Sequence, residues 1–190
     1  MNPALHQLQC EIASSLYGLD ATQTQLYPPS RPGKWTIQLI IEHLLLTYSS
    51  TETAINARLT KRTPTRAEPT LTNRIFRFAV TRCGYFPTGR EAPPMVAPQP
   101  STYPLSGADL TEATAEYLAR LDLLFTEAET LFGPASQCAR HHVLGPLNIG
   151  QWRKFHLVHG KHHLKQILAI RKACNVGPAS TRAVADSKIS

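Results

Sequence analysis

The strongest constraint on this chain is a cluster of four histidines within the eight residues from His156 to His163. Residues 152–170, which contain the cluster, have the pattern of one uninterrupted helix. On a helical projection of about 100° per residue, His163 lies about 40° and His156 about 60° from His159. Gln166 lies about 20° away on the other side. The sequence therefore predicts a helix whose buried face carries imidazole rings in place of leucine or isoleucine.

Buried imidazoles need partners, because burying a neutral polar group without one costs about 1–3 kcal/mol. A metal ion is the simplest common partner for several rings. His159 and His163 are four residues apart, the spacing that places two imidazoles on consecutive helical turns in H-x-x-x-H metal sites. A zinc-type catalytic centre has three protein ligands and an open position for water or substrate. We therefore expect a third ligand from another part of the chain.

Length and composition suit a single globular domain. The chain has 190 residues, of which 42% are hydrophobic and 17% charged, so a disordered chain is excluded. No apolar run approaches the roughly 18 residues of a membrane span, and the N-terminus lacks the features of a signal peptide. We expect no membrane partner and a cytoplasmic location. The four cysteines form no C-x-x-C pair, which argues against a zinc ribbon or a disulfide framework.

The chain is basic, with 20 Lys and Arg against 13 Asp and Glu and a net charge of +7. Part of the excess lies in one stretch: Arg58, Lys61, Arg62, Arg66, Arg74, Arg77, Arg82 and Arg90. Such a stretch is compatible with binding to nucleic acid, with an acidic small substrate, or with a merely soluble surface. No aromatic stacking pattern or nucleic-acid motif accompanies it. This favours a merely soluble surface. The expected partner of the protein is a small-molecule substrate, and nucleic acid stays an alternative.

Helical periodicity dominates the rest of the chain, and no stretch shows a strand pattern. We expect long helices over residues 3–19, 36–59, 106–132 and 148–174, and a short arginine-rich helix over 71–83. A long proline-rich loop follows the short helix, over 86–104. The predicted fold is all-α: an up-down four-helix bundle, with the short helix and the proline-rich loop between its second and third helices. The bundle should occupy residues 1–175, with a flexible tail over 176–190.

Three helix starts carry capping signals. Thr36 is a candidate N-cap for the second long helix. Ser106 with Asp109, and Asn148 with Gln151, have the spacing of a capping box. These signals predict where three of the four long helices begin.

His43 is the candidate third ligand. It is a histidine in the middle of the second long helix, which is mostly apolar and expected to be buried. Thr47 and Ser50 share its face within about 60°, and their short polar side chains would leave room beside a metal ion. A single histidine on an apolar helix face is more often a core residue that has found a hydrogen-bond partner. The pair His159 and His163 on a later helix favours the metal interpretation here.

The same residues resemble the DinB-like superfamily, in particular its domains of unknown function. The resemblance is carried by Trp35 and His43, by L-G-P-L-N-I-G-Q-W over 144–152 and by H-x-x-x-H-x-x-Q over 159–166. It implies a four-helix bundle that binds a divalent metal, Zn, Ni, Mn or Fe, through His43, His159 and His163. Characterised relatives include metal-dependent S-transferases that use bacillithiol, mycothiol or glutathione, and maleylpyruvate isomerase. The insertion over 61–104 is outside the shared pattern and leaves the substrate open.

The remaining candidates surround this site. Gln166 could fix the tautomer of an imidazole, or it could make a hydrogen bond between helices in the core. His156 is expected near the rim of the pocket rather than among the ligands, and His162 is expected to support a ligand. Trp35 and Trp152 are expected to anchor the core at helix starts, and an aromatic wall for the substrate is the alternative. His141 and the histidine after it precede a turn and are expected at the surface.

The hypothesis is a metal-dependent enzyme that moves a low-molecular-weight thiol onto a small electrophilic molecule. A cation at the site can deprotonate a bound thiol, or it can lower the pKa of a bound water to about 7, which would make the protein a hydrolase. A different class of function is a basic helical binding protein for nucleic acid or an acidic partner, with a structural metal or none. A scaffold that forms a homodimer through an apolar helix face is a further alternative.

Overall fold

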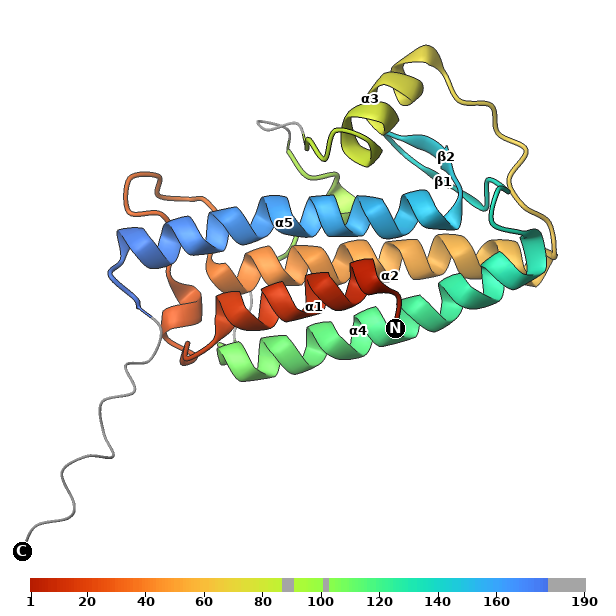
Figure 1. The fold of residues 1–190 in the computed structure, drawn as a ribbon. Coiled ribbons are helices and arrows are strands. Elements are labelled where there is room, and N and C mark those ends of the chain that lie inside the picture. Colours follow the sequence, from red (N-terminus) through yellow and green to blue (C-terminus); the bar gives the residue numbers. More distant parts are fainter. Residues whose placement is uncertain (87–90, 101–102, 178–190) are drawn as a thin grey trace, which may run out of the picture.

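The computed structural model describes residues 1–86, 91–100 and 103–177. Four long helices lie side by side and form a bundle (Figure 1): α1 Pro3–Leu16, α2 Ile37–Lys61, α4 Gly107–Phe132 and α5 Ile149–Ala173. Both α1 and α2 pack against α4 and against α5. The predicted helical bundle is therefore confirmed in its main elements.

The direction of the helices differs from the predicted up-down order. Helices α2 and α4 run the same way, and α1 and α5 run the opposite way (Figure 1). The backbone N–H of Gly107, at the start of α4, donates to Leu19 O just after α1, whereas Thr65 N, after α2, donates to Gln137 O after α4. An up-down pair needs a short connection. The connection over 62–106 is instead long enough to return along the whole bundle before α4 begins.

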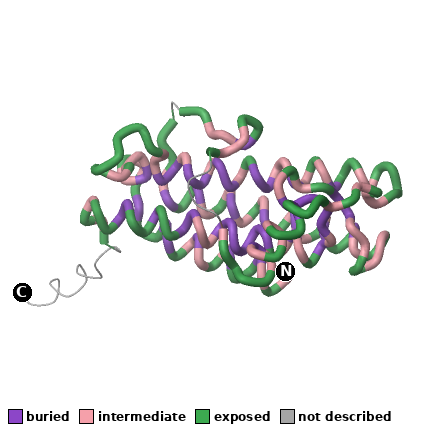
Figure 2. Tube along the Cα trace, turned by 90° about the horizontal axis from the view of Figure 1, so that it is seen from above, coloured by how far each residue is buried: buried purple, intermediate pink, exposed green. Residues whose placement is uncertain are grey.

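The core lies between the four helices, where Figure 2 shows buried segments along the middle of the bundle and exposed loops around it. In α1, Leu5, Leu8, Ile12 and Leu16 are fully buried and recur at spacings of three and four residues. Each such side chain contributes about 1.5–3 kcal/mol through its burial. This stripe packs α1 against α4 and α5.

All three predicted helix starts are confirmed. The side chain of Thr36 accepts from Leu39 N, and complete capping boxes open α4 at Ser106 and α5 at Asn148. A further capping box, at Thr70, opens α3 Leu71–Thr81. Because the capping of α5 fixes its first turn, it also fixes the level at which the histidines of α5 lie in the bundle.

A small β-hairpin corrects the expectation of an all-α chain. Strands β1 Ala139–His141 and β2 Gly145–Leu147 pair antiparallel, with Ala139 opposite Leu147. Each strand has three residues, too few for an alternating pattern to appear in the sequence. Gly145 turns the chain with a φ of 74°, a value that favours glycine.

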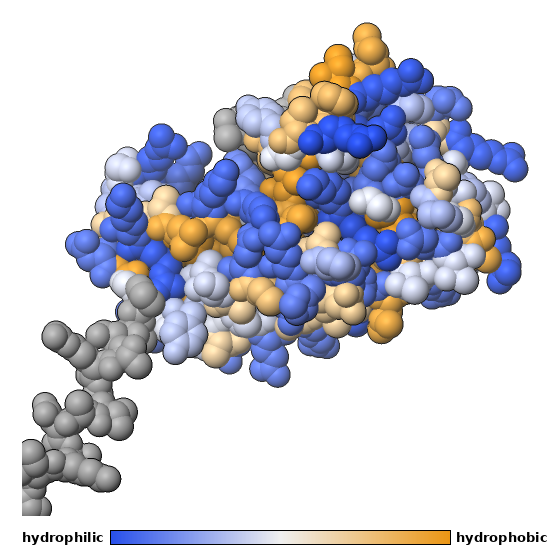
Figure 3. Space-filling view, viewed as in Figure 1, coloured by the Kyte–Doolittle hydropathy of each residue, from blue (hydrophilic) through white to orange (hydrophobic). Residues whose placement is uncertain are grey.

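Helix α3 lies over the hairpin, outside the bundle (Figure 1). The side chain of Asn73 ties the two together, because its Nδ2 donates to Val143 O over 2.6 Å. The opposite face of α3 carries the exposed side chains Leu71, Ile75 and Phe78, and apolar side chains gather at the top of the view in Figure 3. Among the described residues, no helix combines the length and the apolar character needed to cross a membrane.

The C-terminal end of α5 is held by Arg171, which is buried. Its Nη1 donates to Ser15 O over 2.6 Å and to Tyr17 O over 3.1 Å, at the end of α1. Its Nη2 donates to Gly177 O over 3.0 Å. The expected flexible tail over 176–190 lies outside the described residues from 178 onward.

Candidate metal centre

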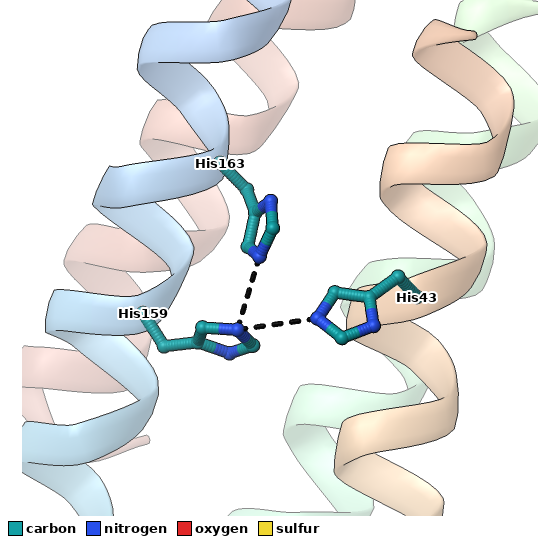
Figure 4. Close-up of side chains that lie close together, drawn as sticks. All are labelled: His43, His159 and His163. Carbon is teal, nitrogen blue, oxygen red and sulfur yellow. Dashed lines mark hydrogen bonds between the residues drawn. The ribbon is translucent and has the colours of Figure 1, made fainter. Parts of the chain in front are cut away.

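Three histidines from two helices meet inside the bundle. His43 of α2 faces His159 and His163 of α5, and the three rings point toward one another (Figure 4). Their Nε2 atoms converge: that of His159 lies 3.2 Å from the Nε2 of His43 and 3.0 Å from the Nε2 of His163. All three side chains are buried, with exposed fractions of 4%, 5% and 6%.

The other ring nitrogen fixes the tautomer of two of these histidines. Nδ1 of His43 lies 2.8 Å from Val96 O, and Nδ1 of His163 lies 2.9 Å from Gln166 Oε1. Both oxygens can only accept, so each Nδ1 carries the hydrogen and each Nε2 keeps a lone pair. Gln166 Nε2 faces His162 Nε2 at 3.2 Å and can donate to it, which is consistent with this orientation of the amide.

Three nitrogen atoms that lie this close repel one another unless a cation lies between them. A hydrogen on Nε2 of His159 can satisfy only one of its two neighbours. A zinc ion binds imidazole nitrogen at about 2.0–2.1 Å, which places two ligands of a tetrahedron about 3.4 Å apart. The Nε2 separations of 3.0 and 3.2 Å are close to this value, and ring nitrogens of the three residues all lie within 4.8 Å of one another. The three histidines can therefore hold a divalent metal ion and leave a coordination position open.

Burial keeps these rings in the form that binds a metal. It lowers the pKa of His43 and, with the neighbouring rings, lowers the pKa of His159 well below its ordinary value. Burial and the proximity of His43 lower the pKa of His163 to about 3. The rings are neutral at pH 7, which is the state a metal ligand requires.

Aromatic rings enclose the triad His43, His159 and His163. The ring of Trp35 lies 4.9 Å from that of His43, and the ring of Phe155 stacks on that of His159 at 5.3 Å with an interplanar angle of 11°. Phe86 lies 4.8 Å from His159 on another side. Trp35 packs against the core as expected, but it is only partly buried and also lines the cavity, which was the alternative.

The triad opens into a cavity of about 1930 Å³ between α2, α5, the hairpin and the proline-rich loop. Thr47 and Ser50 line this cavity, where the sequence placed them. The hydroxyl of Thr47 donates to the backbone oxygen of His43 over 2.9 Å, so it braces the helix rather than facing the triad. The proline-rich loop contributes Val96 and thereby covers one side of the triad.

His156 is not at the rim of the pocket, contrary to the expectation. It is fully buried, and its ring lies 5.3 Å from that of Tyr48 in α2 and 6.1 Å from that of Phe125 in α4. Neither of its ring nitrogens has a hydrogen-bond partner in the described part of the chain. Trp152, 3% exposed, stacks against His156 and anchors the core as predicted.

The other two candidates on α5 lie beside the triad. Among the described residues, Gln166 makes its side-chain hydrogen bonds within α5, to His163 and His162, and not to another helix. His162 is partly exposed and packs between Phe86 and His163, with ring distances of 5.3 and 5.2 Å. His162 also contacts the amide nitrogen of Gln166, whose oxygen lies against Nδ1 of His163. His162 therefore supports a ligand candidate and is not itself one of the three.

Sequence reasoning missed two groups at the site. Val96 contributes a backbone oxygen, which no side-chain pattern reveals. His141, expected at the surface, is held by the hairpin so that it lines the cavity, with its ring 4.5 Å from that of Phe155. The hairpin was the missing information, because it turns this part of the chain back over α5.

Comparisons with known proteins leave the chain without an assigned family. No protein-family model matches it, and no curated protein or solved structure matches it either. What stands is a helical bundle with three buried histidines that can hold a metal ion. The likeness to the DinB-like superfamily rests on the residues alone.

Proposed function

We propose that this protein is a DinB-like, metal-dependent enzyme that transfers a low-molecular-weight thiol to a small electrophilic molecule. His43, His159 and His163 are its metal ligands, for Zn, Ni, Mn or Fe. The observation that carries the proposal is the convergence of three Nε2 atoms, two of which have their lone pairs fixed by hydrogen bonds at Nδ1.

Each residue of the site has a distinct role in this proposal. A bound divalent ion would supply positive charge at the open position, where a thiol loses its proton more easily than in water. Val96 O and Gln166 hold two of the ligand rings in the binding tautomer. Trp35, Phe86 and Phe155 exclude water from the triad and lower the local dielectric constant, which strengthens the interaction between the cation and a thiolate.

Thiol transfer fits the cavity better than hydrolysis does. A metal-dependent hydrolase commonly pairs its metal with a carboxylate that acts as general base. Among the described residues, the cavity is lined by a single carboxylate, that of Glu91, and Glu91 belongs to the proline-rich loop and not to the helices that carry the triad. A thiol needs no such base, because the cation itself stabilises its deprotonated form.

Metal analysis of the untagged protein tests the proposal. We expect one equivalent of Zn, Ni, Mn or Fe per chain after purification, and loss of this metal in His163→Ala. His6→Ala is the matched control, because His6 is an exposed histidine of α1 that does not line the cavity. It should retain the metal.

The thiol is tested on cobalt-substituted protein. A thiolate that binds Co²⁺ gives an intense charge-transfer band in the near ultraviolet, which water does not give. The band should appear with small thiols and be absent in His163→Ala. A protein that retains no metal, or equal metal content in the two alanine variants, would remove the basis of the proposal. Retained metal with no response to thiols would favour the hydrolase.

A further inference from the structure

The cavity that contains the triad is lined by an unusual excess of positive charge. Six of its described lining residues are cationic: Arg31, Lys34, Arg140, Lys154, Lys161 and Lys165. Against them, the same part of the chain offers one anionic lining residue, Glu91. Lys161 forms an ion pair with Glu11 over 3.0 Å. The other five have no ion-pair partner among the described residues, so their charge is not neutralised by the fold.

Two of these cationic residues lie near residues of the site along the chain. Lys165 lies two residues after His163 on α5. Lys34 directly precedes Trp35, whose ring covers His43. Three neutral imidazoles would leave the full charge of a bound divalent ion uncompensated. A cavity with walls of low dielectric constant and charges of one sign concentrates small ions of the opposite sign.

His141 adds a fixed hydrogen-bond donor on the wall of the cavity. Its Nδ1 accepts from Val143 N over 3.1 Å and from Leu144 N over 3.2 Å, in the turn of the hairpin. Because Nδ1 accepts two hydrogen bonds, the single hydrogen of the neutral ring must lie on Nε2. Nε2 has no protein acceptor in the described part of the chain. Burial, which lowers the pKa of His141 to about 3, keeps the ring in this neutral form.

The position of His141 relates it directly to the triad. Its ring lies 4.5 Å from that of Phe155 in an edge-to-face contact, and the ring of Phe155 stacks on that of His159 at 5.3 Å. Phe155 therefore contacts both His141 and a metal-ligand candidate. His141 and the three histidines of the triad line the same cavity.

We propose that the substrate is an acidic small molecule, with a carboxylate or phosphate group that accepts a hydrogen bond from Nε2 of His141. Lys34, Lys165 and their unpaired neighbours hold this group by charge, and the reacting atom of the molecule lies at the triad. This inference rests on the proposed function for the identity of the site. Its electrostatic part does not depend on the metal, so it can be tested separately.

The first test uses metal-free protein and a matched set of ligands, benzoate, phenyl phosphate and benzamide, measured by calorimetry. We expect at least one of the two anions to bind about tenfold or more tightly than neutral benzamide, and the advantage to shrink when salt is raised. The comparison of benzoate with phenyl phosphate decides between carboxylate and phosphate. The second test titrates cobalt-substituted protein with 3-mercaptopropionate and with the neutral amide of this compound. We again expect the anion to bind more tightly than the amide.

Variants locate the effect. Lys34→Gln combined with Lys165→Gln should remove most of the preference for the anion, whereas Lys172→Gln, an exposed lysine of α5 outside the cavity, should leave it intact. His141→Phe keeps the ring contacts and removes the donor, so it should weaken the anion and not the amide. Equal affinity for anion and amide in both tests would overturn the inference, as would a preference that survives the double lysine variant. Failure to take up cobalt would refute the proposed function. The titration of metal-free protein would still test whether the cavity prefers an acidic ligand.

Discussion

Replacing His156 with leucine should stabilise the protein, by an amount that grows as the pH falls. The ring of His156 is fully buried among Tyr48, Phe125 and Trp152, and neither of its nitrogens has a partner in the described part of the chain. Leucine has a similar volume and no polar atom. The lost desolvation penalty should raise the free energy of unfolding by about 1–3 kcal/mol at pH 7.5.

The pH dependence follows from the pKa of the same ring. Burial lowers the pKa of His156 to about 3 in the folded protein, from its ordinary value of 6.5. Below pH 6.5 the unfolded chain binds a proton that the folded protein refuses, so stability present above this pH is lost as the pH falls toward 3. At pH 5.0 the loss amounts to about 1.5 pH units at 1.36 kcal/mol each, or about 2 kcal/mol. The His156→Leu variant has no ionisable group at this position, so it does not lose stability in this way as the pH falls.

Urea unfolding of both proteins, followed by circular dichroism in the presence of a chelator, measures the difference. We expect the advantage of His156→Leu to increase by about 2 kcal/mol between pH 7.5 and pH 5.0, with equal m-values. The subtraction removes the contributions of the other buried histidines, which both proteins share. A difference that is independent of pH, or a variant less stable than the parent at pH 7.5, would show that the ring nitrogens are paired.

Three further predictions concern the site and the packing around it. Gln166→Leu removes the acceptor of Nδ1 of His163 and should weaken metal binding by about 10–100-fold in competition with a chromophoric chelator; unchanged affinity would contradict the role of this amide. Gly160→Ala places a methyl group against the side chain of Leu8 in α1 and should lower stability by about 1–2 kcal/mol, whereas Gly150→Ala, whose added carbon meets only Asn148 Oδ1 at 3.6 Å, should not. Bound metal should be retained at pH 5.5 in the same chelator assay. Burial lowers the pKa of His43, His159 and His163, so protons compete with the metal for the rings only at lower pH. Release of half the metal near pH 6.5 would argue against a buried site.

The helices and the meeting of the three histidines could be predicted because both depend on local spacing. Capping residues indicate where a helix begins, and the spacing of four positions from His159 to His163 places the two rings on one helix face whatever the rest of the fold does. His43 required one further assumption, that an unexplained polar group on a buried face has a partner on another helix. The structure brings these three rings together.

The rest depended on tertiary arrangement. His156 lies within about 60° of His159 on the projection, but one face of α5 is wide enough to meet both the cavity and the core, and the sequence does not say where the border lies. The direction of α4 depends on the path of the connection over 62–106. The hairpin depends on α2 and α3, which pack against its strands, and its three-residue strands are too short to leave an alternating pattern in the sequence.

Val96 has one more consequence, because the same backbone oxygen belongs to the covering loop and to the support of a ligand ring. If the proposed ion is bound, its affinity and the position of Val96 would be coupled thermodynamically. Moving Val96 away from α2 would remove the acceptor from Nδ1 of His43, and a tightly held ion would favour the present position of Val96 by the same free energy. The strength with which Val96 packs against α2 would then help to set how long the ion stays bound.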